Sequence, residues 1–201
     1  MRPAVYPIHA PANQKQAWST ISLENLLSGR SSGRPRLWGS DKRRLALALA
    51  SSVLGLYQTP WLTQDLHSLE IIFLQRPGKS LFGSAFLARP RSTQGLSSAS
   101  AGHILTLVTS NQTLFNLGVL LIELGLGRRV DVSEFRSISQ LTLQVEEECG
   151  GRYATAVNGC IWRGFDCSSS DLEDEQFSAA VYTGVVSVLE EDLNQFLTCL
   201  S

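Results

Sequence analysis

The sequence predicts a mainly α-helical fold, and two apolar segments and one short β-rich run carry this prediction. The segments 42–58 (KRRLALALASSVLGLYQ) and 114–127 (LFNLGVLLIELGLG) have apolar residues around almost their whole circumference, so both are expected to be buried helices. Between them, the run 70–74 (EIIFL) is β-rich and is followed by the turn sequence QRPGKS. Its hairpin partner is expected in SLFGSAFL, so the fold should combine a helical domain with a small β-hairpin.

Length and composition indicate one globular domain. The chain has 201 residues, of which 43% are hydrophobic and 17% are charged, and this is enough to bury a core. We expect an irregular lead-in over residues 1–20 and one domain over residues 21–201. The beginning has no apolar segment typical of a secretory signal, and the longest apolar run is too short to cross a membrane and carries Glu123.

The four cysteines do not have the spacing of a metal site or of a C-x-x-C motif. We expect reduced and mostly buried thiols, a cytoplasmic protein, and no cofactor.

Capping signals set the expected ends of several helices. Ser22 precedes a short helix that Gly29 would end. Ser40 or Asp41 is expected to cap the helix over 42–58.

The last helix is expected to begin at the capping box Ser170-Asp171-Leu172-Glu173. Its acidic residues Glu190, Glu191 and Asp192 should lie mostly off the apolar face. That face is expected to consist of Phe177, Val181, Val185, Val188, Leu189, Leu193 and Phe196.

Charge is unevenly divided along the chain. Residues 1–100 hold 12 Lys/Arg and 4 Asp/Glu, whereas residues 101–201 hold 5 and 14. The basic residues near the start would either bind an anion or an acidic lipid surface, or pair with the acidic C-terminal half. Nucleic acid is not expected as a partner because little aromatic interleaving accompanies them. The candidate anion patch consists of Arg30, Arg34, Arg36, Lys42, Arg43 and Arg44.

The order of these segments resembles the C-lobe of a protein kinase. The stretch 59–74 (TPWLTQDLHSLEIIFL) resembles a catalytic loop followed by a strand, and SLENLLSG resembles the helix after the hinge. LFNLGVLLIELGLGR resembles the central helix, with Gly118, Val119 and Glu123 on the family pattern. The resemblance implies a kinase C-lobe-like domain. The N-lobe is expected to be absent, because its sheet and helix need about 60 residues or more before the first buried helix.

A fungal family of uncharacterised kinase-C-lobe-like domains is more similar still. LALASSVLGLYQTPWL, LFNLGVLLIELGLGR and DLEDEQFSAAVYTGVVSVLEEDL all resemble it, and the likeness spans residues 20–201. Such domains often follow HeLo-type helical domains. The resemblance therefore implies a protein of signalling or self-recognition.

The catalytic-loop resemblance lacks several chemical groups of a working kinase. Asp65 falls on the catalytic aspartate, but His67 replaces the lysine and Glu70 replaces the metal-binding asparagine. Leu81 stands where the aspartate of D-F-G would be, and leucine has no ligand atom. The alternative interpretations are structural: Asp65 as a residue that caps local backbone N–H groups, and His67 as a surface histidine.

These observations predict a non-enzymatic, pseudokinase-like interaction domain with a protein partner. Two alternatives stay open. One is an atypical kinase lobe completed by an N-lobe in trans, and the other is a binder of anions or lipid headgroups through the basic patch.

Overall fold

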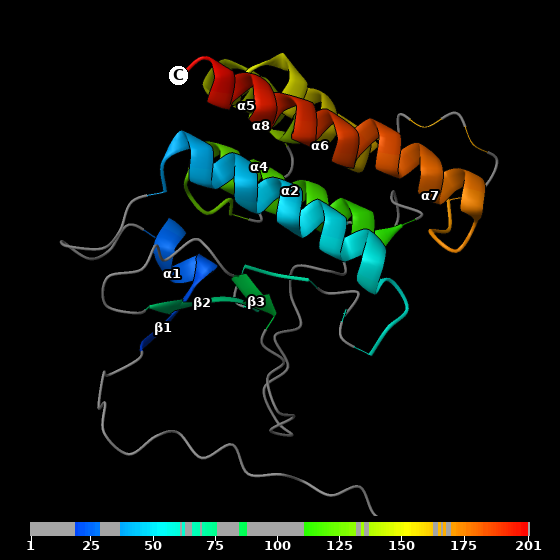
Figure 1. Cartoon of the computed structure of the whole chain (residues 1–201), viewed down its shortest axis with the longest axis horizontal. Helices are drawn as coiled ribbons and strands as arrows, with labels where there is room; N and C mark the ends of the chain where they lie inside the picture. The colour runs from blue at the N-terminus through cyan, green and yellow to red at the C-terminus, as the bar shows by residue number, and fades with distance from the viewer. Residues whose placement is uncertain are drawn as a thin grey trace, which may run out of the picture.

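Three layers make up the fold. The computed structural model describes residues 19–28, 37–60, 62, 66–68, 70–75, 85–87, 111–131, 134, 137–162, 165, 167 and 170–200. A small sheet and a short helix form one side, two long helices form the middle, and the C-terminal helices form the other side (Figure 1). The expected mainly α-helical fold is confirmed.

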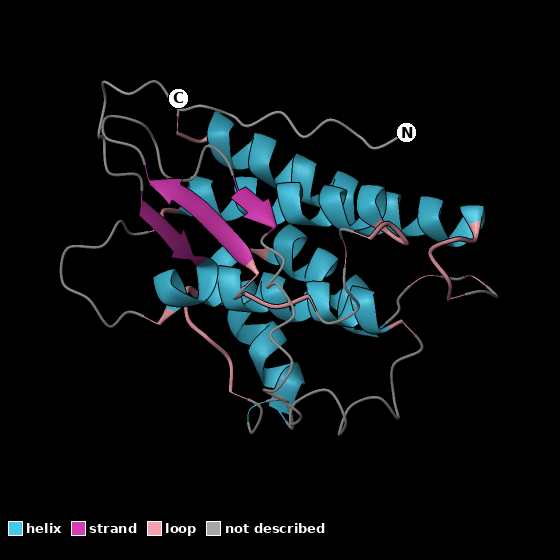
Figure 2. Ribbon diagram, turned by 90° about the horizontal axis from the view of Figure 1, so that it is seen from below, coloured by secondary structure: helices cyan, strands magenta, loops and turns pink. Residues whose placement is uncertain are grey.

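The sheet has three antiparallel strands in the order β1 (Ser19–Ser22), β2 (Ile71–Gln75) and β3 (Ala85–Leu87) (Figure 2). The pair β2–β3 confirms the expected hairpin, with Ile72 opposite Phe86. The strand β1 was not expected. Its sequence STIS carries a single apolar residue and so has no alternating pattern; its pairing to β2 defines it.

The short helix α1 (Leu23–Leu27) confirms the expected cap. The Ser22 hydroxyl accepts a hydrogen bond from the Asn25 amide at 3.2 Å. Leu23 and Leu27 are buried in the core, so α1 is held to the rest of the domain by its apolar face.

The helix α2 (Gly39–Leu56) corrects two expectations. It begins before Ser40 and Asp41, and its N-cap is Trp38, which makes no side-chain capping bond. It is also not buried all round, because Arg44, Ala48, Ser51 and Gly55 form an exposed stripe. Small side chains count as apolar or neutral in a pattern, yet they can face water at little cost. The buried face comprises Arg43, Leu45, Ala46, Leu49, Ala50 and Val53.

The helix α4 (Gln112–Leu126) is the enclosed helix of the fold, as expected. Eleven of its 15 residues are buried. Asn111 caps its start by accepting the Leu114 amide at 2.9 Å, and Gly127 ends it at a φ of 66°. Gly118 permits close contact with α6, since a Cβ there would lie 2.7 Å from Ile161 Cδ1 and 3.0 Å from the Cβ of Cys160.

The C-terminal helices cover α4 and α2. They are α5 (Ile138–Cys149), α6 (Gly151–Trp162), α7 (Glu175–Val181), the π-helical segment η3 (Tyr182–Ser187) and α8 (Val188–Thr198). Gly150 is the C-cap of α5, at a φ of 94°. The capping-box prediction is wrong: Asp174 is the N-cap of α7 and accepts the Phe177 amide at 2.9 Å.

The apolar face expected for the last helix is confirmed, because all seven of its residues are buried or half-buried. The expectation for Asp192 is wrong. Asp192 is buried, since it lies three residues after the buried Leu189 and therefore on the same helical face.

All four cysteines are free: Cys149 and Cys160 are buried, Cys167 is half-buried and Cys199 is exposed. Among the described helices, none combines the length and apolar character needed to span a membrane.

Candidate functional site

The catalytic-loop-like segment contributes backbone turns and two buried side chains before β2, Leu66 and Ser68, to the described structure. His67 is exposed, and its carbonyl accepts the Glu70 amide at 3.0 Å. Glu70 is half-buried just before β2. Ser68, which the sequence analysis did not single out, is 3% exposed. Asp65 and the Leu81-Phe82-Gly83 triplet lie outside the described residues.

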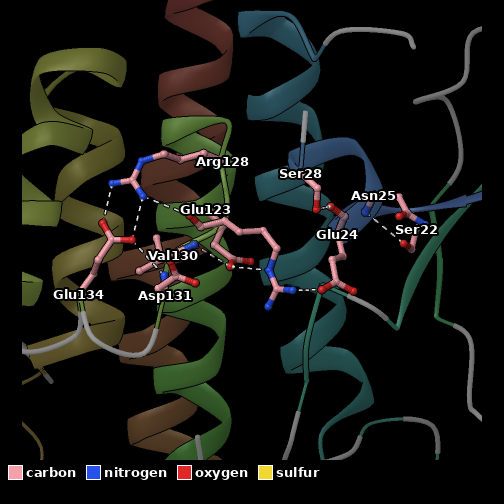
Figure 3. Close-up of polar contacts among 10 residues, drawn as sticks. Ser22, Glu24, Asn25, Ser28, Glu123, Arg128, Val130, Asp131 and Glu134 are labelled. Carbon is pink, nitrogen blue, oxygen red and sulfur yellow. Dashed lines mark hydrogen bonds and ion pairs between the residues drawn. The ribbon is translucent and has the colours of Figure 1, made fainter. Parts of the chain in front are cut away.

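Glu123 is the acceptor at the centre of this region. It lies in the last turn of α4, is 4% exposed, and accepts the Val130 amide on Oε1 at 3.2 Å (Figure 3). The Ser68 hydroxyl also donates a hydrogen bond to this carboxylate. The Nε of Arg129 lies 3.7 Å from Oε1. A buried carboxylate needs such partners, because an isolated one would be costly.

The same cluster fastens α1 to the end of α4. Arg129 forms an ion pair with Glu24 of α1 as well as with Glu123. The Glu24 amide donates to the Ser68 carbonyl at 3.1 Å. Three parts of the chain that lie far apart in sequence therefore meet here, and we call Glu24, Ser68, Glu123, Arg129 and Val130 the α4-end cluster.

A second ion pair follows immediately along the chain. Arg128 holds Glu134 through two hydrogen bonds of 3.0 and 2.9 Å, and Glu134 also accepts the Asp131 amide at 3.0 Å. The Arg128 guanidinium lowers the pKa of Glu134. This arrangement shapes the turn after α4 (Figure 3).

Burial raises the pKa of Glu123, and the hydrogen bonds from Val130 and Ser68 oppose only part of that rise. A buried carboxylate with a raised pKa is often a catalytic group. Here its oxygens are engaged by the protein's own donors, which favours a structural role.

The raised pKa predicts a distinct pH dependence of stability. The folded protein holds the Glu123 proton more tightly than the unfolded chain, so the free energy of unfolding falls as pH rises from the unfolded pKa through the folded one. We expect the stability of the wild type relative to Glu123→Gln to decrease over that interval. Urea denaturation of both proteins from about pH 4 to pH 8 measures this difference.

Glu134→Gln is the matched control with the opposite sign. Because the pKa of Glu134 is lowered, its contribution to stability is present above the unfolded pKa and is lost as pH falls through the folded one. A wild-type advantage over Glu123→Gln that grows with pH would contradict the account of Glu123.

The residues of the candidate anion patch have different environments in the structure. Arg43 is 8% exposed, and its Nε donates to Asp192 at 2.7 Å while an Nη donates to the Cys149 carbonyl at 2.6 Å. Its guanidinium lies 4.1 Å from the Phe196 ring centre. Arg43 therefore follows the alternative in which basic residues pair with the acidic half, and it is not available to a surface anion.

The other patch residues differ from Arg43. The Nζ of Lys42 donates to the Gly125 carbonyl at 2.9 Å, while Arg44 is exposed. Arg34 and Arg36 lie outside the described residues, as does Arg30. An anion site built on Arg34, Arg36 and Arg44 stays a prediction.

Sequence analysis did not identify the buried carboxylates that hold parts of the fold together. Glu123 was noted only as part of a pattern, and Asp192 was assigned to the surface. A signal existed for Asp192, because it lies three residues after Leu189 and four before Phe196. Among the residues that the structure describes, no group of three His, Cys, Asp or Glu side chains is arranged to hold a metal ion.

Comparison with known proteins gives one match. A family model described as a domain of unknown function (DUF7580) matches residues 6–196. Neither the curated proteins nor the solved structures contain a match.

Proposed function

Since the chain belongs to the family described as a domain of unknown function (DUF7580), we propose its role from its own residues: a non-catalytic, pseudokinase-like domain that acts by binding another protein. The match spans nearly the whole chain, so the proposal concerns the family's domain as a unit. The resemblance to fungal C-lobe-like domains adds signalling or self-recognition as the proposed setting.

The observation that carries the proposal is the structural role of Ser68 and Glu123. Both side chains are buried, and they join the catalytic-loop-like segment to the end of α4. Phosphoryl transfer requires side chains that point at the phosphates and metal ions. In the α4-end cluster the charged side chains instead pair with each other, Glu123 accepts the Val130 amide, and the Glu24 amide donates to the Ser68 carbonyl.

The loss of particular residues supports the same proposal. His67 and Glu70 stand where the resemblance places a lysine and an asparagine, and His67 is exposed. The lysine at that position would offset phosphate charge with its ammonium group, and His67 does not supply this group.

A thermal-shift measurement with Mg²⁺ and ATP tests the proposal against the alternative of a kinase lobe. We expect no stabilisation of the wild-type chain, because a ligand that does not bind the folded state leaves its stability unchanged. A clear rise in melting temperature that Asp65→Asn abolishes would support the kinase alternative and overturn the proposal.

A further inference from the structure

A groove of about 660 Å³ opens on the surface between α2 and the α7–η3 segment. These helices lie side by side (Figure 1), and α2 contacts η3 directly. Its lining is mainly apolar, with an acidic part contributed by the turn before α7 and by the first residue of that helix. The lining residues are Ser51, Leu54, Gly55, Leu172, Glu173, Glu175, Ser178, Ala179 and Tyr182.

Both walls of the groove are helical stripes of the kind that receive another helix. On α2 the stripe is Ser51, Leu54 and Gly55, which have the spacing i, i+3 and i+4. On the other wall Glu175, Ser178, Ala179 and Tyr182 have the spacing i, i+3, i+4 and i+7. Four of these seven residues are small, so the backbone of an occupant can approach closely.

The groove also exposes apolar surface to solvent. Tyr182 is 52% exposed, and a Cβ built at Gly55 meets nothing within 4 Å. Leu172 lines the groove but is itself almost fully buried. Tyrosine supplies a large apolar face and a polar tip, which is why it is enriched where proteins bind each other.

The charge of the groove indicates the character of the occupant. Glu173 and Glu175 line it, and within the part of the chain that the structure describes neither forms an ion pair. Asp171 and Asp174 lie beside them in the sequence, and no basic residue is among the described residues that line the groove. An acidic rim around an apolar floor is complementary to a segment that carries basic and apolar residues together.

We propose that this groove is the docking site for a basic, amphipathic helix of a partner protein. The inference rests on the proposed interaction function and assigns that function a surface and a partner chemistry. The apolar face of the incoming helix contacts Leu54, Ala179 and Tyr182, and its Lys or Arg residues face Glu173 and Glu175. This is helix-in-groove recognition, in which shape gives affinity and the charged rim gives specificity.

A labelled amphipathic peptide of about 15 residues, composed of Leu, Ala and Lys, is the probe. Fluorescence anisotropy should show saturable binding to the full chain that weakens with added salt. A peptide with Glu in place of Lys should bind at least about tenfold more weakly, and so should the Lys peptide with one central residue replaced by proline, which prevents helix formation.

Two variants test the site on the protein. Gly55→Leu places a side chain into the open groove and suits a helix better than glycine, so it should stay folded and reduce binding about tenfold or more. Glu173→Lys/Glu175→Lys should have a similar effect through charge. Glu147→Lys/Glu148→Lys changes the net charge equally on exposed α5 positions and should leave binding within about twofold.

The outcomes separate this inference from the function on which it rests. Absence of peptide binding, equal binding by all variants, or preference for the Glu peptide or for anionic vesicles would overturn the groove assignment. None of these results changes the response to Mg²⁺ and ATP, so the non-catalytic proposal would then stand by itself. A thermal shift with Mg²⁺ and ATP that Asp65→Asn abolishes would instead overturn the proposal of a non-catalytic domain.

Discussion

Asp192→Ala is expected to lower the free energy of unfolding by about 3–5 kcal/mol. Asp192 and Arg43 are both more than nine-tenths buried and are joined at 2.7 Å. Truncating the carboxylate leaves the guanidinium buried without its anion, and the remaining acceptors at Cys149 and Gly39 are neutral carbonyls. Urea denaturation followed by circular dichroism measures the loss.

The double variant Arg43→Met/Asp192→Leu is the control for this prediction. Replacing a buried ion pair by apolar side chains of similar size is often neutral or stabilising, because the desolvation of both charges is removed. We expect the double variant to be clearly more stable than Asp192→Ala alone. If Asp192→Ala is as stable as the wild type, Arg43 and Asp192 do not form the buried pair.

Phe73→Ala is expected to cost about 3–5 kcal/mol, the usual loss when a fully buried phenylalanine is truncated. Phe73 is 0% exposed and lies in β2, the central strand of the sheet. With Ile71 it belongs to the same core cluster as the α4 residues Leu117 and Leu121, so the sheet and the helices share one core. The same denaturation measurement applies.

Leu74→Ala on the neighbouring position is the matched control. Successive side chains of a strand point to opposite faces, and Leu74 is only half-buried. We expect a cost of about 1 kcal/mol. Equal costs at the two positions would mean that the sheet does not turn the Phe73 face toward the helical core.

Sequence patterns predicted the elements that carry their own signals. The helix α4 was predicted because it combines a long apolar run with a glycine at its end, and both features are local. The hairpin β2–β3 was predicted from a β-rich run and a turn. The sheet face of Phe73 follows from strand alternation once β2 is placed.

Tertiary contacts decide the features that the sequence did not predict. The strand β1 is defined by its pairing to β2, and its four residues are too few for a sequence pattern that would predict this pairing. Several residues in Ser170 to Asp174 are suitable caps. The cap of α7 is Asp174, three residues before Phe177, which begins the buried face of that helix.

The candidate site was predictable only in part for the same reason. Ser68 and Glu123 stand 55 positions apart, and no local spacing connects them. The pairing of Arg43 with Asp192 was foreseen only as a general attraction between a basic and an acidic half. Identifying the individual partners required knowledge that α2 and α8 are neighbours.

A double-mutant cycle with Ser68→Ala and Glu123→Ala tests the central claim most directly, namely that these residues join parts of the fold. Near neutral pH, we expect their effects on the free energy of unfolding to be coupled by about 0.5–3 kcal/mol, so that Ser68→Ala costs less once Glu123 has been truncated. Effects that add to within about 0.3–0.5 kcal/mol would contradict a joint structural role for the two side chains.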